Sequence, residues 1–146
     1  MATVDQIAHE ISTLIPKLMR TVQTSSLLKL NISSAQIIIL ITIQAHGQCK
    51  TKIVAKERGI SPPTATGLID RLVRSGYVKR SPDPEDRRVV MVSLTKKGEN
   101  MVKTHMDAIR DVWKKILVRL TAEEQKQYLH ILKKISGATE PTSSTA

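Results

Sequence analysis

The sequence has very few aromatic residues and a single cysteine. Its 146 residues include no phenylalanine, two tyrosines, one tryptophan and one cysteine, Cys49. With so few rings, a platform on which unpaired bases stack is hard to build, which disfavours single-stranded nucleic acid as a partner. One cysteine cannot form an internal disulfide, so a disulfide-stapled extracellular scaffold is excluded and a reducing compartment is favoured.

Long apolar runs and catalytic signatures are also missing. No run is long enough to span a membrane and the N-terminus lacks the pattern of a secretion signal, so we expect a cytoplasmic protein without a membrane partner. There is no Ser-His-Asp set, no pair of acids suited to a cleft, no glycine-rich phosphate loop and no cofactor motif, so we expect neither an enzyme nor a cofactor. His46 and Cys49 have a metal-like spacing, but too few further ligands accompany them for a zinc site.

The charge is strongly positive and unevenly distributed. Against 13 Asp and Glu the chain carries 23 Lys and Arg, a net charge of +10. Residues 50–103 hold 13 of these cations and 6 of the acids, a local charge of +7, whereas residues 1–49 carry +1 and residues 104–146 carry +2. A basic middle third favours a polyanionic partner, and the shortage of aromatic rings makes duplex DNA the better candidate.

The apolar pattern of the first half predicts helices. Apolar residues at helical spacing predict a helix over residues 4–18, in which Pro16 causes either a bend or a break. Residues 36–43 read QIIILITI and by β-propensity alone would form a strand, but the capping-box pattern at Ser33 favours a buried helix. A short basic helix over 51–58 ends at Gly59, and Ser61 caps the next helix.

The two helices joined through Gly59 fit a helix-turn-helix, whose second helix enters the major groove of DNA. In that second helix the side predicted to face outward carries small and basic residues, and small side chains allow bases to approach closely. An ordinary solvated helix face is the competing interpretation. The residues predicted to read or contact DNA from this helix are Ser61, Pro63, Thr64, Thr66, Gly67, Arg71 and Arg74.

After Gly76 the apolar period changes to two, which predicts strands over residues 77–80 and 89–94. A hairpin in this position is the wing of a winged helix-turn-helix, held out by Pro82 and Pro84. We expect Asp86 to orient Arg88 from the same side of a strand, and Arg87 to reach a narrow minor groove. Alternatively the loop acids merely neutralise the arginines. The predicted wing contacts are Lys79, Arg80, Asp86, Arg87 and Arg88.

The stretch from Ser61 to Thr95 resembles the MarR family of transcriptional regulators. The matching segments are S-P-P-T-A-T-G-L-I-D-R-L-V-R-S-G-Y-V-K-R, then D-P-E-D-R-R, then a strand ending in L-T followed by K-K-G. The resemblance implies a homodimeric repressor that binds a pseudo-palindromic operator and is released by a small, often aromatic, ligand. It places Thr64, Thr66 and Arg71 on the reading helix and Arg87 and Arg88 on the wing. Gly67 and Pro16 depart from the family pattern, and Gly67 puts direct base readout at its position in doubt.

The fold we expect is mainly α with a small β-hairpin wing, in one domain over residues 1–137. Its DNA-binding part is about residues 33–95, flanked by helices at about 4–29 and 96–136. We expect these flanking helices to form a dimer, because the core of one helix-turn-helix is too small to cover all of their apolar stripes. Thr95 is predicted to cap the long helix that follows it, and Thr121 with Glu124 forms a capping-box pattern that starts the last helix. Residues 138–146 form a predicted disordered polar tail.

Lys17 and Arg20, three apart on the first helix, could clamp the carboxylate of an aromatic ligand. The alternative function is a basic helical module that binds an acidic protein.

Overall fold

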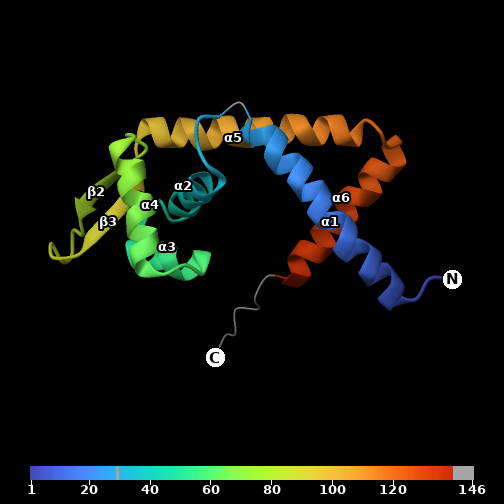
Figure 1. Ribbon diagram of the computed structural model, residues 1–146, viewed down its shortest axis with the longest axis horizontal. Helices are drawn as coiled ribbons and strands as arrows, with labels where there is room; N and C mark the ends of the chain where they lie inside the picture. The colour runs from blue at the N-terminus through green and yellow to red at the C-terminus, as the bar shows by residue number, and fades with distance from the viewer. Residues whose placement is uncertain (29, 140–146) are drawn as a thin grey trace. The chain divides into compact units, whose positions relative to one another are not determined.

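A computed structural model describes residues 1–28 and 30–139 and confirms a mainly helical fold with a small sheet (Figure 1). The chain divides into two compact units, residues 1–110 and residues 111 onward, and the boundary lies inside α5. None of the described helices is both long and apolar enough to cross a membrane. The elements in chain order are α1 (Val4–Leu27), α2 (Ser34–His46), β1 (Gln48–Lys50), α3 (Thr51–Arg58), α4 (Pro62–Arg74), β2 (Val78–Pro82), β3 (Val90–Leu94), α5 (Lys96–Leu117) and α6 (Ala122–Thr139).

The apolar run that could have been a strand is the helix α2, as its cap predicted. The Ser33 hydroxyl accepts a hydrogen bond from the Gln36 backbone N–H at 3.2 Å, and the Gln36 side chain accepts one from the Ser33 N–H at 3.1 Å. This reciprocal cap starts the helix, and burial on nearly all sides then suits its β-branched residues. Ile39, Leu40 and Ile43 are at most 1% exposed and form the centre of the core.

The helix α1 continues through Pro16, so that proline does not break it. Its N-terminus is fixed by a capping box between Thr3 and Gln6. Val22 and Ser26 near the other end are the buried residues of this helix. Most of its apolar residues are instead exposed, among them Ile7, Ile11, Leu14, Ile15 and Met19.

The predicted helix-turn-helix is α3, the turn at Gly59 and α4. Gly59 has φ 62° and ψ 33°, the left-handed conformation that glycine adopts without strain and that often ends helices. Ser61 then caps α4 by accepting from the Thr64 N–H at 3.2 Å. Ala65, Ile69 and Leu72 are fully buried, so α4 packs this side inward and turns its opposite side to solvent.

The hairpin belongs to a three-stranded antiparallel sheet with the order β1-β3-β2. Its two long strands confirm the predicted wing, with Val78 opposite Leu94 and Pro82 opposite Val90. The third strand, β1, places Cys49 opposite Val92 and was not predicted. A strand of three residues is too short to show a period of two, and only its partner reveals it.

The start of α5 is fastened to the hairpin. The Thr95 N–H donates to the Tyr77 carbonyl at 3.0 Å, and the Thr95 hydroxyl accepts from the Gly98 N–H at 3.1 Å, which caps the helix as predicted. Gly98 lies so close to the chain that a Cβ there would collide with the Tyr77 carbonyl oxygen. Glycine therefore permits the close approach of α5 to the base of the wing.

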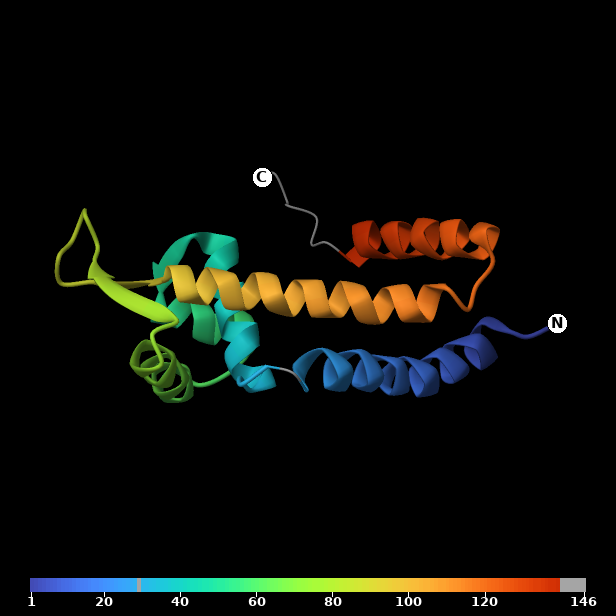
Figure 2. The same cartoon turned by 90° about the horizontal axis from the view of Figure 1, so that it is seen from above.

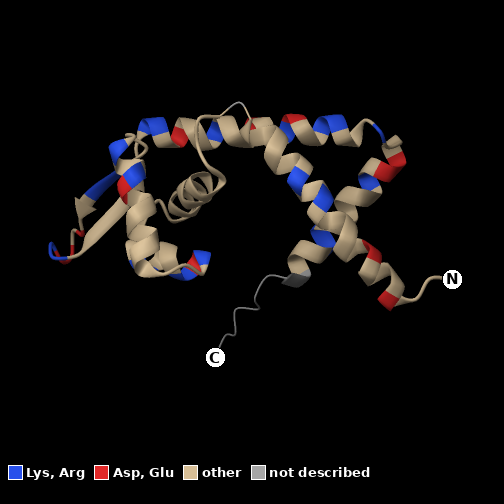
Figure 3. Cartoon of the chain, viewed as in Figure 1, with Lys and Arg blue, Asp and Glu red and all other residues tan. Residues whose placement is uncertain are grey.

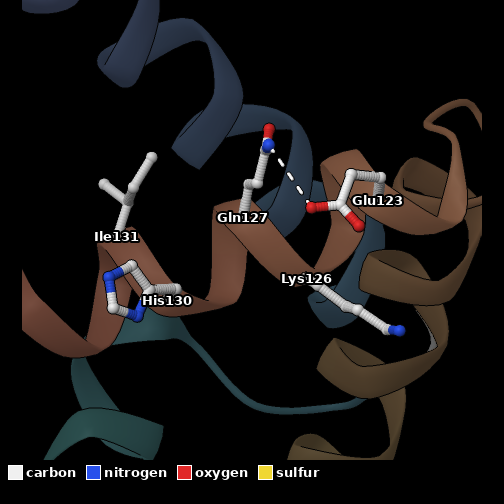
Figure 4. Close-up of a pocket in the computed structure, with 5 residues that line it drawn as sticks. All are labelled: Glu123, Lys126, Gln127, His130 and Ile131. Carbon is white, nitrogen blue, oxygen red and sulfur yellow. Dashed lines mark hydrogen bonds between the residues drawn. The ribbon is translucent and has the colours of Figure 1, made fainter.

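The second unit contains the end of α5 and α6. Thr121 and Glu124 form the predicted capping box, and the rings of Trp113 and Tyr128 lie 6.1 Å apart. A depression of about 380 Å³ lies on α6, where the Gln127 amide donates to Glu123 at 3.5 Å. Figure 4 shows the side chains that line it. All the residues lining it come from this one helix, so it is an open helix face. The predicted polar tail falls outside the described residues from 140 onward, and α6 itself runs to Thr139.

Candidate nucleic-acid interface

The exposed side of α4 carries the residues predicted from the sequence. Near its start the Ser61 and Thr64 hydroxyl oxygens lie 2.8 Å apart, so the Thr64 hydroxyl is held against the cap. Two residues further along, the exposed Thr66 presents a hydroxyl and a methyl group. Arg71 and Arg74, in the last turns, are also exposed. This side therefore combines small polar groups near the N-terminus with cations near the other end, which suits the reading of base edges and phosphates.

Gly67 lies between Thr64 and Arg71 on the same exposed side. A Cβ added at Gly67 would meet no heavy atom within 4 Å. Packing within the protein therefore does not require glycine here, although glycine in a helix interior costs stability relative to alanine. Its effect is to leave a low point on the surface of α4 at which another backbone or a base can approach closely.

An ion pair joins α4 to the wing. The Arg80 guanidinium on β2 donates to the Asp70 carboxylate on α4, and both side chains are about 40% exposed (Arg80 37%, Asp70 42%). Arg80 was predicted as a DNA contact, and the structure shows that its guanidinium also braces the hairpin against the helix. The pairing could not be read from the sequence, because the two residues are ten positions apart and lie on different elements.

The wing loop is built by turns, and one predicted detail of it is wrong. Asp86 and Arg88 do not lie on a strand: they form a turn in which the Asp86 carboxylate accepts the Arg88 backbone N–H at 3.1 Å. The predicted pairing nevertheless forms, with the Arg88 guanidinium donating to both Asp86 oxygens at 3.1 and 3.3 Å. These hydrogen bonds from Arg88 lower the pKa of Asp86. At the neck, the Asp83 N–H donates to the Val89 carbonyl at 2.8 Å and closes the loop.

Neutralisation by the loop acids is incomplete. The Asp83 carboxylate accepts the Glu85 backbone N–H, and among the described residues Arg87 has no ion-pair partner. Even the paired Arg88 has a side chain that is 91% exposed. The loop projects from the end of the hairpin in both views (Figures 1 and 2). Figure 3 shows Lys and Arg on the loop, on β2 and toward one end of α4, whereas α2 has none.

A cavity of about 230 Å³ lies among α1, α2 and the first half of α5. His105 lines it, is only 5% exposed, and its Nδ1 has no hydrogen-bond partner among the described residues. Burial lowers the pKa of His105, which favours the neutral ring. The remaining walls are mostly apolar, and the predicted clamp residues Lys17 and Arg20 are exposed on α1 and do not line the cavity.

The two residues with metal-like spacing are engaged separately. His46 Nε2 lies 2.7 Å from a Glu57 carboxylate oxygen, which joins α2 to α3. Cys49 is 5% exposed, and burial, aided by the Glu57 charge, raises the pKa of its thiol. A raised pKa lowers the thiolate fraction and hence the reactivity of the thiol. Within the described part of the chain no three His, Cys, Asp or Glu groups gather as metal ligands.

Comparison with known proteins identifies relatives along most of the chain. A model of the MarR family matches residues 32–90. The transcriptional repressor MdtR of Bacillus subtilis is 28% identical over 96% of this chain and 92% of its own length. The multiple antibiotic resistance protein MarR of Escherichia coli is 32% identical over 73% of this chain and 74% of its own. The crystal structure of a cysteine-to-serine mutant of that MarR with operator DNA has a TM-score of 0.63 at 26% identity, covering 92% of this chain and 99% of the other.

Proposed function

The chain belongs to the MarR family of transcriptional regulators, and from that membership we propose that it is a homodimeric repressor of a pseudo-palindromic operator. The observation that carries the proposal is the pairing of an exposed, small-residue reading side on α4 with a cationic loop braced to it through Asp70 and Arg80. Known relatives are named as regulators rather than enzymes, which supports a role without catalysis. A regulator of this kind acts in the cytoplasm, where the DNA is.

In the proposed complex α4 lies in the major groove and the wing loop follows the adjacent minor groove. Thr66 and the surface around Gly67 face base edges, while Arg71 and Arg74 contact bases or phosphates. Arg87 enters the minor groove, where narrow A·T-rich DNA has an enhanced negative potential, and Lys79 contacts phosphate. The DNA-bound structure of a relative supports duplex DNA as the partner.

We propose that a second copy covers the terminal helices. Ile7, Ile11 and Leu14 on α1 are 48–58% exposed, and Leu132 and Ile135 on α6 are 40% and 55% exposed. Repeated exposure of large apolar side chains along one helix face is unfavourable in water, and a two-fold interface removes it. Two-fold symmetry also repeats α4 once per half-site, which explains a palindromic operator.

The cavity at His105 is the proposed site of the releasing ligand. Its volume of about 230 Å³ is below the roughly 300 to 1,000 Å³ of drug-sized sites, so one ring fills it. The unpartnered His105 Nδ1 can hydrogen-bond to a hydroxyl of an aromatic ligand. Lys17 and Arg20 stay a prediction for a carboxylate on such a ligand.

An electrophoretic mobility shift assay with fragments of the source genome tests the proposed function. We expect one or a few fragments to shift at protein concentrations that leave the bulk unshifted, and to resist excess nonspecific DNA at physiological salt. Equal retardation of every fragment at low salt, and none at physiological salt, would contradict the proposal. That result would favour the alternative, a basic module for an acidic protein.

A further inference from the structure

A second cavity, of about 240 Å³, lies between α2 and the helix-turn-helix and opens to solvent at Ala35 and Arg58. We propose that it binds a small apolar monocarboxylate at a site distinct from the cavity at His105. Its walls come from α2, from the end of α3, from the turn and from α4, all within the first unit of the chain. The lining residues are Ala35, Ile38, Ile39, Arg58, Ile60 and Leu68.

The lining side chains of the cavity indicate that most of the ligand is apolar. Five of the six lining side chains are aliphatic, and none is aromatic or acidic. Their methyl and methylene groups favour binding of an alkyl group, because apolar surface is then buried. They supply no hydrogen bond to a polar group in the same place. Because the volume of about 240 Å³ is again below that of drug-sized sites, the ligand is a short alkyl chain or a single ring.

Arg58 indicates that the ligand carries a negative charge. It is the single charged residue of the lining, and the described part of the chain provides it with no ion-pair or hydrogen-bond partner. The acidic residues of α3 and α4 are already engaged, Glu57 by His46 and Asp70 by Arg80. A planar guanidinium matches a carboxylate in a bidentate geometry. One exposed cation beside five aliphatic walls fits a single carboxylate at the solvent side with an apolar body inside, and it fits a polyanion poorly.

The position of the cavity connects it to DNA recognition. On α4, Leu68 follows Thr64 by four residues and precedes Arg71 by three, so the three side chains are neighbours on the helix surface. A ligand against Leu68 therefore contacts the flank of the proposed reading side. Ile38 lines this cavity and also the one at His105, so α2 separates two cavities that share one side chain. That an occupant here alters operator binding rests on the proposed function, whereas the site itself does not.

Isothermal titration calorimetry of the full chain without DNA tests the site, with hexanoate as the probe and hexanamide as its neutral counterpart. We expect saturable binding of hexanoate and weaker binding of hexanamide. Arg58→Gln should weaken hexanoate about three- to ten-fold, as expected for a mostly exposed ion pair, and leave hexanamide unchanged. Arg58→Lys should restore part of the loss, because the charge returns without the bidentate geometry.

Two further variants separate the two cavities. Ala35→Leu enlarges an exposed side chain that lines only the helix-turn-helix cavity and should abolish hexanoate binding, whereas Ile109→Trp fills the other cavity and should leave it intact. A thermal melt of each variant checks that it is folded. No saturable binding by the wild type, equal affinity of wild type and Arg58→Gln, or loss of binding only in Ile109→Trp would overturn the proposal. Since no DNA is present, failure of the proposed function cannot produce any of these results.

Discussion

The central helix-turn-helix and the terminal helices differ in how far their apolar side chains are buried. The buried apolar side chains of the described structure all lie between Val22 and Val102, and those of α2 are almost inaccessible. In contrast, α1 before Val22 and α6 expose most of their large apolar residues, many by about half (Ile11 51%, Ile135 55%). The difference shows that the central segment completes its own core, and the exposure of the terminal helices is the basis of the proposed dimer interface.

The largest expected effect comes from charging the exposed apolar face of α6. The double variant Leu132→Glu with Ile135→Glu places carboxylates in an interface that the account requires to be apolar. Each unpaired buried charge costs several kcal/mol, so we expect the dissociation constant of the dimer to rise more than about a hundredfold. Sedimentation equilibrium measures the change, and the circular dichroism of the monomer should remain helical.

The matched control is Lys133→Glu, an exposed position on the same helix that changes the charge by the same two units. It should leave the oligomeric state intact. If the double variant sediments like the wild type, or if the wild type is itself a monomer, the terminal helices do not form the proposed interface. The exposure of their apolar side chains would then have no explanation.

The effect of intermediate size concerns a glycine in the central segment and a glycine in a terminal helix. Gly67 on α4 and Gly137 on α6 are both free of neighbours that a Cβ would touch. Replacement by alanine should stabilise either helix by about 0.5–1 kcal/mol. Only Gly67→Ala should weaken operator binding, by about tenfold, because a methyl group then blocks the close approach of DNA. Thermal unfolding and fluorescence anisotropy measure the two effects, and equal operator affinity of both variants would remove the assigned role of Gly67.

The smallest effect concerns His105, which lies where α1 meets the central core. Burial lowers its pKa in the folded state below the ordinary value of 6.5. Between these two pKa values the unfolded chain therefore binds more protons than the folded chain. The stabilisation from the neutral His105 ring is fully present above pH 6.5 and is lost as the pH falls toward the folded-state pKa. His105→Leu should flatten the decrease in unfolding free energy between pH 7.5 and 5.5 seen in urea titrations. A slope for His105→Leu parallel to that of the wild type would contradict the assignment.

Much of the fold followed from local signals in the sequence. The caps at Ser33, Ser61, Thr95 and Thr121 set helix starts correctly, and at Ser33 the cap decided between helix and strand. Local hydrogen bonds of this kind depend on residues three apart, which a sequence displays directly. The change of period after Gly76 revealed the wing for the same reason.

Features that depend on distant residues did not follow from the sequence. The strand β1 exists because Cys49 meets Val92, and the brace between Asp70 and Arg80 joins two elements. Asp86 and Arg88 do pair, yet through a turn whose hydrogen bonds no alternation pattern encodes. The two cavities arise where three or more elements fail to fill the space between them, so neither the isolated His105 nor Arg58 could be identified beforehand.

The most direct test of DNA binding through the wing is the salt dependence of operator affinity in wild type and in the double variant Arg87→Ala with Arg88→Ala. Each lost phosphate contact reduces the slope of log affinity against log salt concentration by about one, so the slope should become shallower by up to about two while affinity falls. An unchanged slope and affinity would show that the cationic loop does not contact the duplex.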